Sequence, residues 1–223
     1  AEKIESWELA LPPEIKLAYL PQPGIVRLRL TGRGPDQGSI ANMIASAKDD
    51  LYRLIPEYIF GEDDETLEEV LGKAMKSAGA TLCTAESCTG GYIAHLITRI
   101  AGASDYFLGS VVSYSNDAKV NLLGIPGEVI MQHGAVSEEV VCMMARNSRE
   151  KFGATYSLAV SGIAGPGGGT GEKPVGTTWI ALATPQGVVA RKLLFGDHRE
   201  RNIRRSALQA MMMLYKELKC PSF

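Results

Sequence analysis

The chain has 223 residues, which is long enough for one large domain or two unequal ones. Its hydrophobic fraction of 45%, charged fraction of 22% and net charge of −2 argue against collagen-like, disordered and membrane classes, and give no electrostatic reason to expect nucleic-acid binding. No apolar run approaches the roughly 18 residues that cross a bilayer, and the first residues lack a signal-peptide layout, so we expect a cytoplasmic protein without membrane contact.

The start of the chain predicts a small α+β domain. Residues 25–30 (IVRLRL) alternate apolar and polar side chains with the period of a strand. Apolar residues in the segment 40–55 then recur at helical spacing. Gly61 and the acidic residues after it mark a boundary, so we expect one domain over residues 1–62 and a second over residues 63–223. The chain begins with Ala rather than Met, and we expect it to be a piece of a longer protein.

In the second domain, strand and helix patterns alternate, which favours a layered α/β arrangement. Helix patterns cover residues 65–79, 88–102, 116–124, 137–153 and 199–218, and residues 125–134 form a short turn or helix. Strand patterns cover residues 80–87, 106–115 and 156–165, and residues 176–195 predict two strands joined across TPQG. We therefore predict a three-layer α/β/α domain with a mixed sheet.

The stretch TLCTAESCTGG, residues 81–91, places Ser87 where a strand pattern passes into a helix pattern. Ser87 can be a nucleophile, a phosphate ligand or only the cap of the next helix, and position alone favours the cap. A serine nucleophile needs a base. His95 falls inside the following helix, and nothing in the sequence pairs His133 or His198 with a carboxylate, which disfavours a Ser-His-Asp triad.

Lysine is the alternative base, because burial can lower its pKa until the neutral amine accepts a proton. Lys119 lies in SYSNDAK, at the end of a predicted strand, so its helix is expected to start at the same sheet edge as the helix after Ser87. Tyr114 has a hydroxyl that can relay a proton or orient the lysine. A solvent-facing lysine and a packed tyrosine are the ordinary alternatives for this pair.

Two further segments are candidates for ligand binding. The glycine-rich residues 162–176 lack the Gly-Lys-Ser/Thr of a P-loop. Their small side chains would let the backbone contact a ligand closely, and the alternative is a flexible surface loop. The basic cluster at the last helix consists of Arg199, Arg201, Arg204 and Arg205. Guanidinium groups are well shaped to bind a carboxylate or phosphate. The commoner arrangement for such a cluster is a solvent-exposed helix face on which the arginines pair with Asp197 and Glu200.

The sequence predicts neither a metal site nor disulfides. No grouping of His, Cys, Asp and Glu has the spacing of metal ligands, so we expect a metal-free site. The four cysteines, at positions 83, 88, 142 and 220, have no short-spaced pair and are expected to be buried free thiols.

Five segments in order, TAESCTGG, SYSNDAK, HGAVSEE, SGIAGPGGGTGEKPVGT and FGDHRE, resemble the C-terminal domain of the CinA (competence-damage-inducible) family. The resemblance covers about residues 64–223, and the preceding segment resembles the small KH-like middle region of full-length CinA. It implies a serine amidohydrolase that converts nicotinamide mononucleotide (NMN) and water to nicotinate mononucleotide and ammonia. We expect this reaction to need no cofactor.

The resemblance maps the nucleophile onto Ser87, the general base onto Lys119 and an assisting hydroxyl onto Tyr114. The expected substrate-binding residues are Cys88, Thr89 and Gly90 at the helix start, Gly165, Gly167 and Gly168 in the glycine-rich loop, and Arg199 with Arg201 as its alternative. The helix-start amides are expected to bind an oxyanion, and the arginines and the glycine-rich loop a phosphate. Glu86 is expected to be a substrate or structural ligand, without a catalytic role.

Other functions stay open at this point. The domain can bind a pyridine nucleotide without turning it over, as a regulatory module, although such a module needs neither a nucleophile nor a base. A nucleic-acid role would use residues 32–35, which resemble the GxxG loop of KH domains only loosely. For the enzyme we expect a small-molecule substrate, no nucleic-acid partner and a homo-oligomer.

Overall fold

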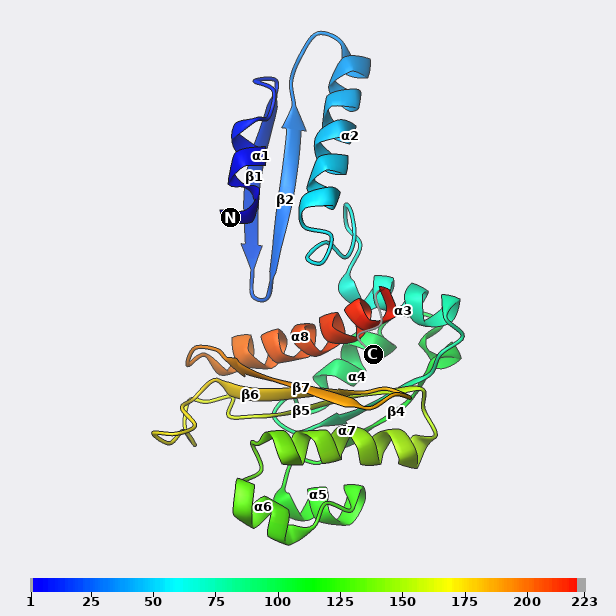
Figure 1. Ribbon diagram of the computed structural model, residues 1–223, viewed down its shortest axis with the longest axis vertical. Helices are drawn as coiled ribbons and strands as arrows, with labels where there is room; N and C mark the ends of the chain where they lie inside the picture. The colour runs from blue at the N-terminus through cyan, green and yellow to red at the C-terminus, as the bar shows by residue number, and fades with distance from the viewer. Residues whose placement is uncertain (1, 220–223) are drawn as a thin grey trace. The chain divides into compact units, whose positions relative to one another are not determined.

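The computed structural model, which describes residues 2–219, divides between Phe60 and Gly61 into two units (Figure 1). The first unit contains a 3-10 helix (Glu2–Ile4), α1 (Glu5–Leu9), β1 (Ile15–Gln22), β2 (Ile25–Gly32) and α2 (Gln37–Leu54). The two strands pair antiparallel. The side chains of Trp7, Ala47 and Leu51 form part of a small core, in which the Trp7 indole donates to the Ala47 carbonyl at 3.0 Å.

Sequence reasoning found β2 and α2 but missed β1. The prolines that flank and enter this strand, among them Pro21 opposite Val26, hide its alternation of side chains. The helix also begins earlier than its apolar pattern, at Gln37, because the Asp36 carboxylate accepts the amides of Gly38 and Ser39. Local capping therefore determines where α2 starts.

The second unit is built around a five-stranded sheet. Its elements are α3 (Leu67–Ser77), β3 (Leu82–Glu86), α4 (Tyr92–Thr98), a 3-10 helix (Ala103–Asp105), β4 (Phe107–Val112), α5 (Asn116–Leu123), α6 (Gly127–His133), α7 (Glu138–Phe152), β5 (Tyr156–Gly162), β6 (Thr177–Ala183), β7 (Val188–Leu194) and α8 (Arg199–Lys219). The strand order is β4-β3-β5-β6-β7. Strand β3 runs parallel to β4 and β5, whereas β6 pairs antiparallel with β5 and β7, so the predicted mixed sheet is confirmed.

Helices cover both faces of this sheet (Figure 1). Helices α3, α4 and α8 lie on one face, and α7 lies on the other with α5 and α6 packed against it. Buried side chains of α7, such as Val141 and Met144, pack against Ala85 of β3 and Ala159 of β5. This arrangement confirms the three-layer α/β/α architecture.

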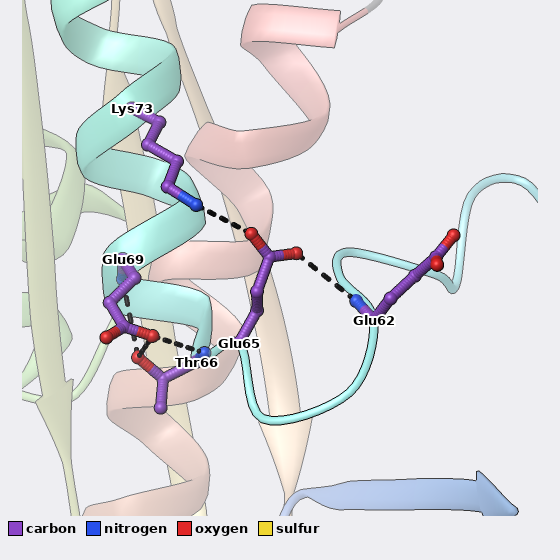
Figure 2. Close-up of polar contacts among 5 residues, drawn as sticks. All are labelled: Glu62, Glu65, Thr66, Glu69 and Lys73. Atoms are coloured by element: carbon purple, nitrogen blue, oxygen red, sulfur yellow. Dashed lines mark hydrogen bonds and ion pairs between the residues drawn. The ribbon is translucent and has the colours of Figure 1, made fainter.

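Helix α3 begins with a capping box, which Figure 2 shows. The Thr66 amide donates to the Glu69 carboxylate at 2.8 Å, and the Glu69 amide donates to the Thr66 hydroxyl at 3.4 Å. Lys73 pairs with Glu65 at 2.6 Å one turn further along. The helix ends before Gly79, whose φ of +59° lies in the left-handed region, as the sequence predicted.

The helix predicted over residues 88–102 is wrong at both ends, because α4 extends only from Tyr92 to Thr98. Residues 88–91 form a turn in which Gly90 and Gly91 have φ values of +61° and +94°, outside the helical region. At the other end, Gly102 has a φ of +78°, and a 3-10 helix follows. The turn before α4 is therefore a separate element, and the candidate nucleophile Ser87 begins it, because the Gly90 amide donates to the Ser87 carbonyl.

Each of the three cysteines that the structure describes has a free thiol. Cys83 and Cys88 are buried, and Cys142 is only partly buried. The prediction of burial therefore holds for two of these three positions, while Cys220 lies outside the described residues.

Candidate active site

Ser87 follows directly after β3, whose five residues are all buried. The apolar side chains of this strand hold it in the middle of the sheet, between β4 and β5. Because these three strands are parallel, the segments that follow them leave the sheet at the same edge. The Ser87 amide donates to the Val160 carbonyl of β5 at 3.0 Å, which fixes the serine backbone to the sheet.

Lys119 reaches the serine from α5, the helix after β4. The hydroxyl of Ser115 caps this helix by accepting the Ala118 amide. The Lys119 side chain is 1% exposed, and its Nζ atom lies 3.0 Å from Ser87 Oγ. The same nitrogen donates to the carbonyl of Ser113 at 2.8 Å. The predicted juxtaposition of a serine and a buried lysine is therefore present in the structure.

Burial lowers the pKa of Lys119 below its ordinary value of 10.5, and the neighbouring Cys88 opposes this only in part. The hydrogen-bond acceptors around Nζ are a hydroxyl and carbonyls, without a carboxylate among the described contacts of this amine. A neutral amine is therefore favoured relative to an exposed lysine. Burial also raises the pKa of the Cys88 thiol to about 12, so Cys88 stays protonated near neutral pH.

The amides of the first turn of α4 are occupied by a side chain from β3. Glu86 is fully buried, and its carboxylate accepts the amides of Gly91 at 3.1 Å, Ile93 at 3.0 Å and Ala94 at 2.9 Å. The Gly90 amide donates to the Ser87 carbonyl at 3.0 Å. Gly90 therefore cannot offer its amide to a ligand without losing this bond.

The amides of Cys88 and Thr89 differ from these neighbours. Neither donates a hydrogen bond to another residue in the part of the chain that the structure describes, and the Cys88 amide interacts only with its own thiol. The Thr89 hydroxyl is also buried without a partner there. This short turn therefore retains donors for a ligand, while the helix behind it does not.

Arg199, the first residue of α8, connects two other segments at the site. Its guanidinium donates to the Tyr114 hydroxyl at 2.9 Å and to the Gly165 carbonyl at 2.9 Å. Tyr114 is 59% exposed, so it stands at the rim rather than in the interior. Arg201 contacts His198 through its backbone amide, at 3.4 Å.

A cavity of about 230 Å³ joins these groups. It is lined by Ser87, Cys88, Tyr114, Asn116, Lys119, Ala135, Val136, Ser161, Gly162, Ala164 and Arg199. Five of the expected site residues are in this lining, namely Ser87, Lys119, Tyr114, Cys88 and Arg199. The other expected residues, Thr89, Gly90, Gly165, Gly167, Gly168 and Arg201, are outside it.

Sequence reasoning missed the cavity wall formed by the end of β5 and the segment before α7. Ser161 is buried, and its hydroxyl donates to the Ala135 carbonyl at 2.7 Å, which joins the two segments. At Gly162, a Cβ atom would lie 2.7 Å from Thr178 Oγ1 and 3.1 Å from Cys88 Sγ. The sequence signal for this wall was the strand pattern over residues 156–165, since a parallel pairing of that strand with β3 places its end beside Ser87.

Within residues 2–219, no three His, Cys, Asp or Glu side chains come together as metal ligands. Over the same residues, no helix has the length and apolarity needed to cross a bilayer. His95, His133 and His198 are all outside the cavity lining.

Sequence comparison places these features in a family. Residues 64–218 match the family described as the CinA C-terminal domain. The CinA-like protein of Cytophaga hutchinsonii is 50% identical over 219 residues, which make up 98% of this chain and 52% of that protein. The CinA-like protein of Flavobacterium psychrophilum is 49% identical over 219 residues, with the same shares. The chain thus spans about half the length of these curated relatives.

Solved structures share the fold of the second unit. The competence/damage inducible protein CihA from Agrobacterium tumefaciens aligns with a TM-score of 0.67 at 37% identity, over 72% of this chain and 98% of that one. A competence-damaged protein (CinA) superfamily protein from Escherichia coli aligns with a TM-score of 0.66 at 26% identity, over 73% of this chain and 97% of that one.

Proposed function

Because the chain belongs to the family of CinA C-terminal domains, a family that includes amidases, we propose that it is a Ser/Lys amidohydrolase that deamidates NMN. The products are nicotinate mononucleotide and ammonia, a reaction of pyridine nucleotide recycling. The observation that carries the proposal is the 3.0 Å distance between Lys119 Nζ and Ser87 Oγ in a buried site.

Lys119 acts as general base in this mechanism. Its carbonyl contacts orient the amine and leave the lone pair of the neutral form available for the Ser87 hydroxyl proton. Oγ then attacks the carboxamide carbon, and Lys119 returns the proton to the leaving nitrogen as the C–N bond breaks and ammonia departs. Water, deprotonated by the same amine, hydrolyses the resulting ester and regenerates Ser87.

The oxyanion is stabilised by the amides of Cys88 and Thr89, which are close to the nucleophile and have no acceptor in another described residue. The Gly90 amide, expected from the sequence to take part, is held by the Ser87 carbonyl instead. The proposed oxyanion site is therefore the turn after β3 rather than the start of α4.

The dimensions and charge of the cavity favour a nucleotide that enters by its ring. At about 230 Å³ the cavity is smaller than the roughly 300–1,000 Å³ of common ligand pockets, so it suits a pyridine carboxamide better than a whole nucleotide. The ribose phosphate then extends toward the rim. Arg199 uses two of its five N–H donors on Tyr114 and Gly165, and the others are suited to a phosphate.

Ammonia release from NMN tests the proposal directly. Wild type should release ammonia, and Ser87→Ala should lower kcat by at least about 10³-fold. Ser77→Ala, at an exposed position on α3, is the matched control and should retain wild-type activity. Equal rates for wild type and Ser87→Ala would exclude a serine hydrolase and favour a module that binds pyridine nucleotides without turnover.

A further inference from the structure

Glu86 is a fully buried carboxylate directly before the candidate nucleophile. It accepts three amides from the start of α4 and lies 3.4 Å from the hydroxyl of Thr84. Among the ion pairs of the described residues, none involves Glu86. The positive end of the helix therefore compensates its charge in place of a cationic side chain.

These contacts close the turn that contains Ser87. The Glu86 side chain extends from the last residue of β3 to Gly91, Ile93 and Ala94, and so spans residues 87–90. Two glycines with positive φ, Gly90 and Gly91, complete the turn, and such residues have many other conformations open to them. The carboxylate is the side chain that ties the two ends of this turn together.

The same contacts decide which amides face a developing negative charge. The first-turn amides of α4 are occupied, and the carboxylate neutralises that end of the helix. The amides of Cys88 and Thr89, inside the closed turn, donate to no other described residue. The direction in which these two N–H groups point depends on the backbone conformation of the turn.

We propose that Glu86 is a positioning residue, which holds the turn of residues 87–90 so that the Ser87 hydroxyl and the amides of Cys88 and Thr89 meet the same carbonyl group. This inference rests on the proposed amidase function. It gives Glu86 a part in the rate of the reaction, which a helix cap alone does not have.

Glu86→Gln tests the proposal, because it keeps the shape of the side chain but replaces one acceptor oxygen with an NH₂ group. Loss of oxyanion alignment should lower kcat by about 10- to 100-fold, with KM within about twofold of wild type. The acidic limb of the pH–rate profile should stay in place, since Lys119 is untouched. Glu69→Gln is the matched control: its carboxylate also caps a helix start (Figure 2), and Glu69 is outside the cavity lining. It should lower Tm and leave kcat unchanged.

A second readout does not require NMN. A fluorophosphonate probe labels an activated serine, and mass spectrometry identifies Ser87 as the labelled residue. Labelling should slow in Glu86→Gln by a factor similar to the loss of kcat. If wild type neither labels nor releases ammonia, the proposed function fails; if wild type labels without releasing ammonia, only the substrate is wrong and the labelling rates still test Glu86.

The proposal is overturned if folded Glu86→Gln loses Tm but keeps wild-type kcat and labelling rate. Should Glu86→Gln not fold, Glu86→Asp takes its place, because it keeps the charge but is too short to reach all three amides at once. A lowered kcat at unchanged KM in Glu86→Asp supports positioning, and a wild-type kcat overturns it. If neither variant folds, Glu86 is a structural residue and the proposal is wrong.

Discussion

Lys119 Nζ lies 3.0 Å from Ser87 Oγ, although 32 residues separate the two in sequence. Their contact follows from the pairing of β3 with β4, which brings the segments after both strands to one edge of the sheet. The Ser113 amide extends this pairing by donating to the Glu86 carbonyl at 2.8 Å. Nucleophile and base are therefore positioned by the sheet rather than by a mobile loop.

The first prediction concerns the pH dependence of kcat/KM. Only neutral Lys119 can take the Ser87 proton, so activity should fall as pH falls through the lowered pKa of this amine. Lys119→Arg should lack this acidic limb and retain little activity, because a guanidinium stays charged at every accessible pH. Rates measured from about pH 5 to pH 10 check this. An unchanged limb in Lys119→Arg would rule out Lys119 as the base.

The second prediction concerns the pH dependence of stability. Folding lowers the pKa of Lys119, so between that lowered value and 10.5 the unfolded chain binds more protons than the folded one. The free energy of unfolding of wild type should therefore rise with pH across this window, relative to Lys119→Met. Below the window Lys119→Met should be the more stable protein. Urea denaturation at several pH values measures this, with the exposed Lys151→Met as control for the loss of a positive charge. A pH-independent difference would contradict the prediction.

The third prediction separates the two candidate arginines. Arg199→Ala should raise KM for NMN by about 10- to 100-fold, because it removes charge-assisted hydrogen bonds to the phosphate. It should have a much smaller effect on nicotinamide riboside, which has no phosphate. Arg201 is outside the cavity lining, so Arg201→Ala should leave KM for NMN and KM for nicotinamide riboside within about twofold of wild type. Equal losses with both substrates in Arg199→Ala would show that Arg199 does not bind the phosphate.

The fourth prediction concerns Cys88, which is adjacent to the nucleophile. With its pKa raised to about 12 by burial, the thiol should resist iodoacetamide at pH 8. Cys88→Ala keeps the backbone amide, so its kcat should remain within about threefold of wild type. Cys142→Ala, at a partly buried cysteine outside the cavity lining, is the control. Inactivation by iodoacetamide that Cys88→Ala prevents would instead make the thiol part of the chemistry.

Much of the second unit was predictable because its central strands, β3 and β5, are short runs of mostly small or apolar residues that are buried on both faces. The residues of β3 are all buried, and so are five of the seven in β5, and such runs are typical of strands covered on both faces. The two strand patterns that precede Ser87 and Lys119 follow each other in the chain. We therefore expected both residues to lie at the same sheet edge. The local strand patterns and the chain order were sufficient to predict this part of the site.

The details of the site were not predictable, because they depend on contacts between segments. Glutamate is not a favoured capping residue, so nothing local indicated that Glu86 would accept the amides at the start of α4. The glycine-rich loop suggested a phosphate cradle, whereas Gly165 meets Arg199 through its carbonyl and Gly167 is outside the cavity lining. Ser161 was missed because its partner, Ala135, is 26 residues away.

The glycine-rich loop connects two antiparallel strands, and both of its ends are fixed beside the cavity. The Ile163 amide donates to the Thr177 carbonyl and the Gly176 amide to the Ile163 carbonyl, each at 2.8 Å. Insertions or deletions at its tip therefore leave β5, β6 and the Ser87–Lys119 pair in register. Evolution can alter the length and composition of the entrance while the reacting groups stay where they are, so substrate preference and chemical step are separable traits in this fold.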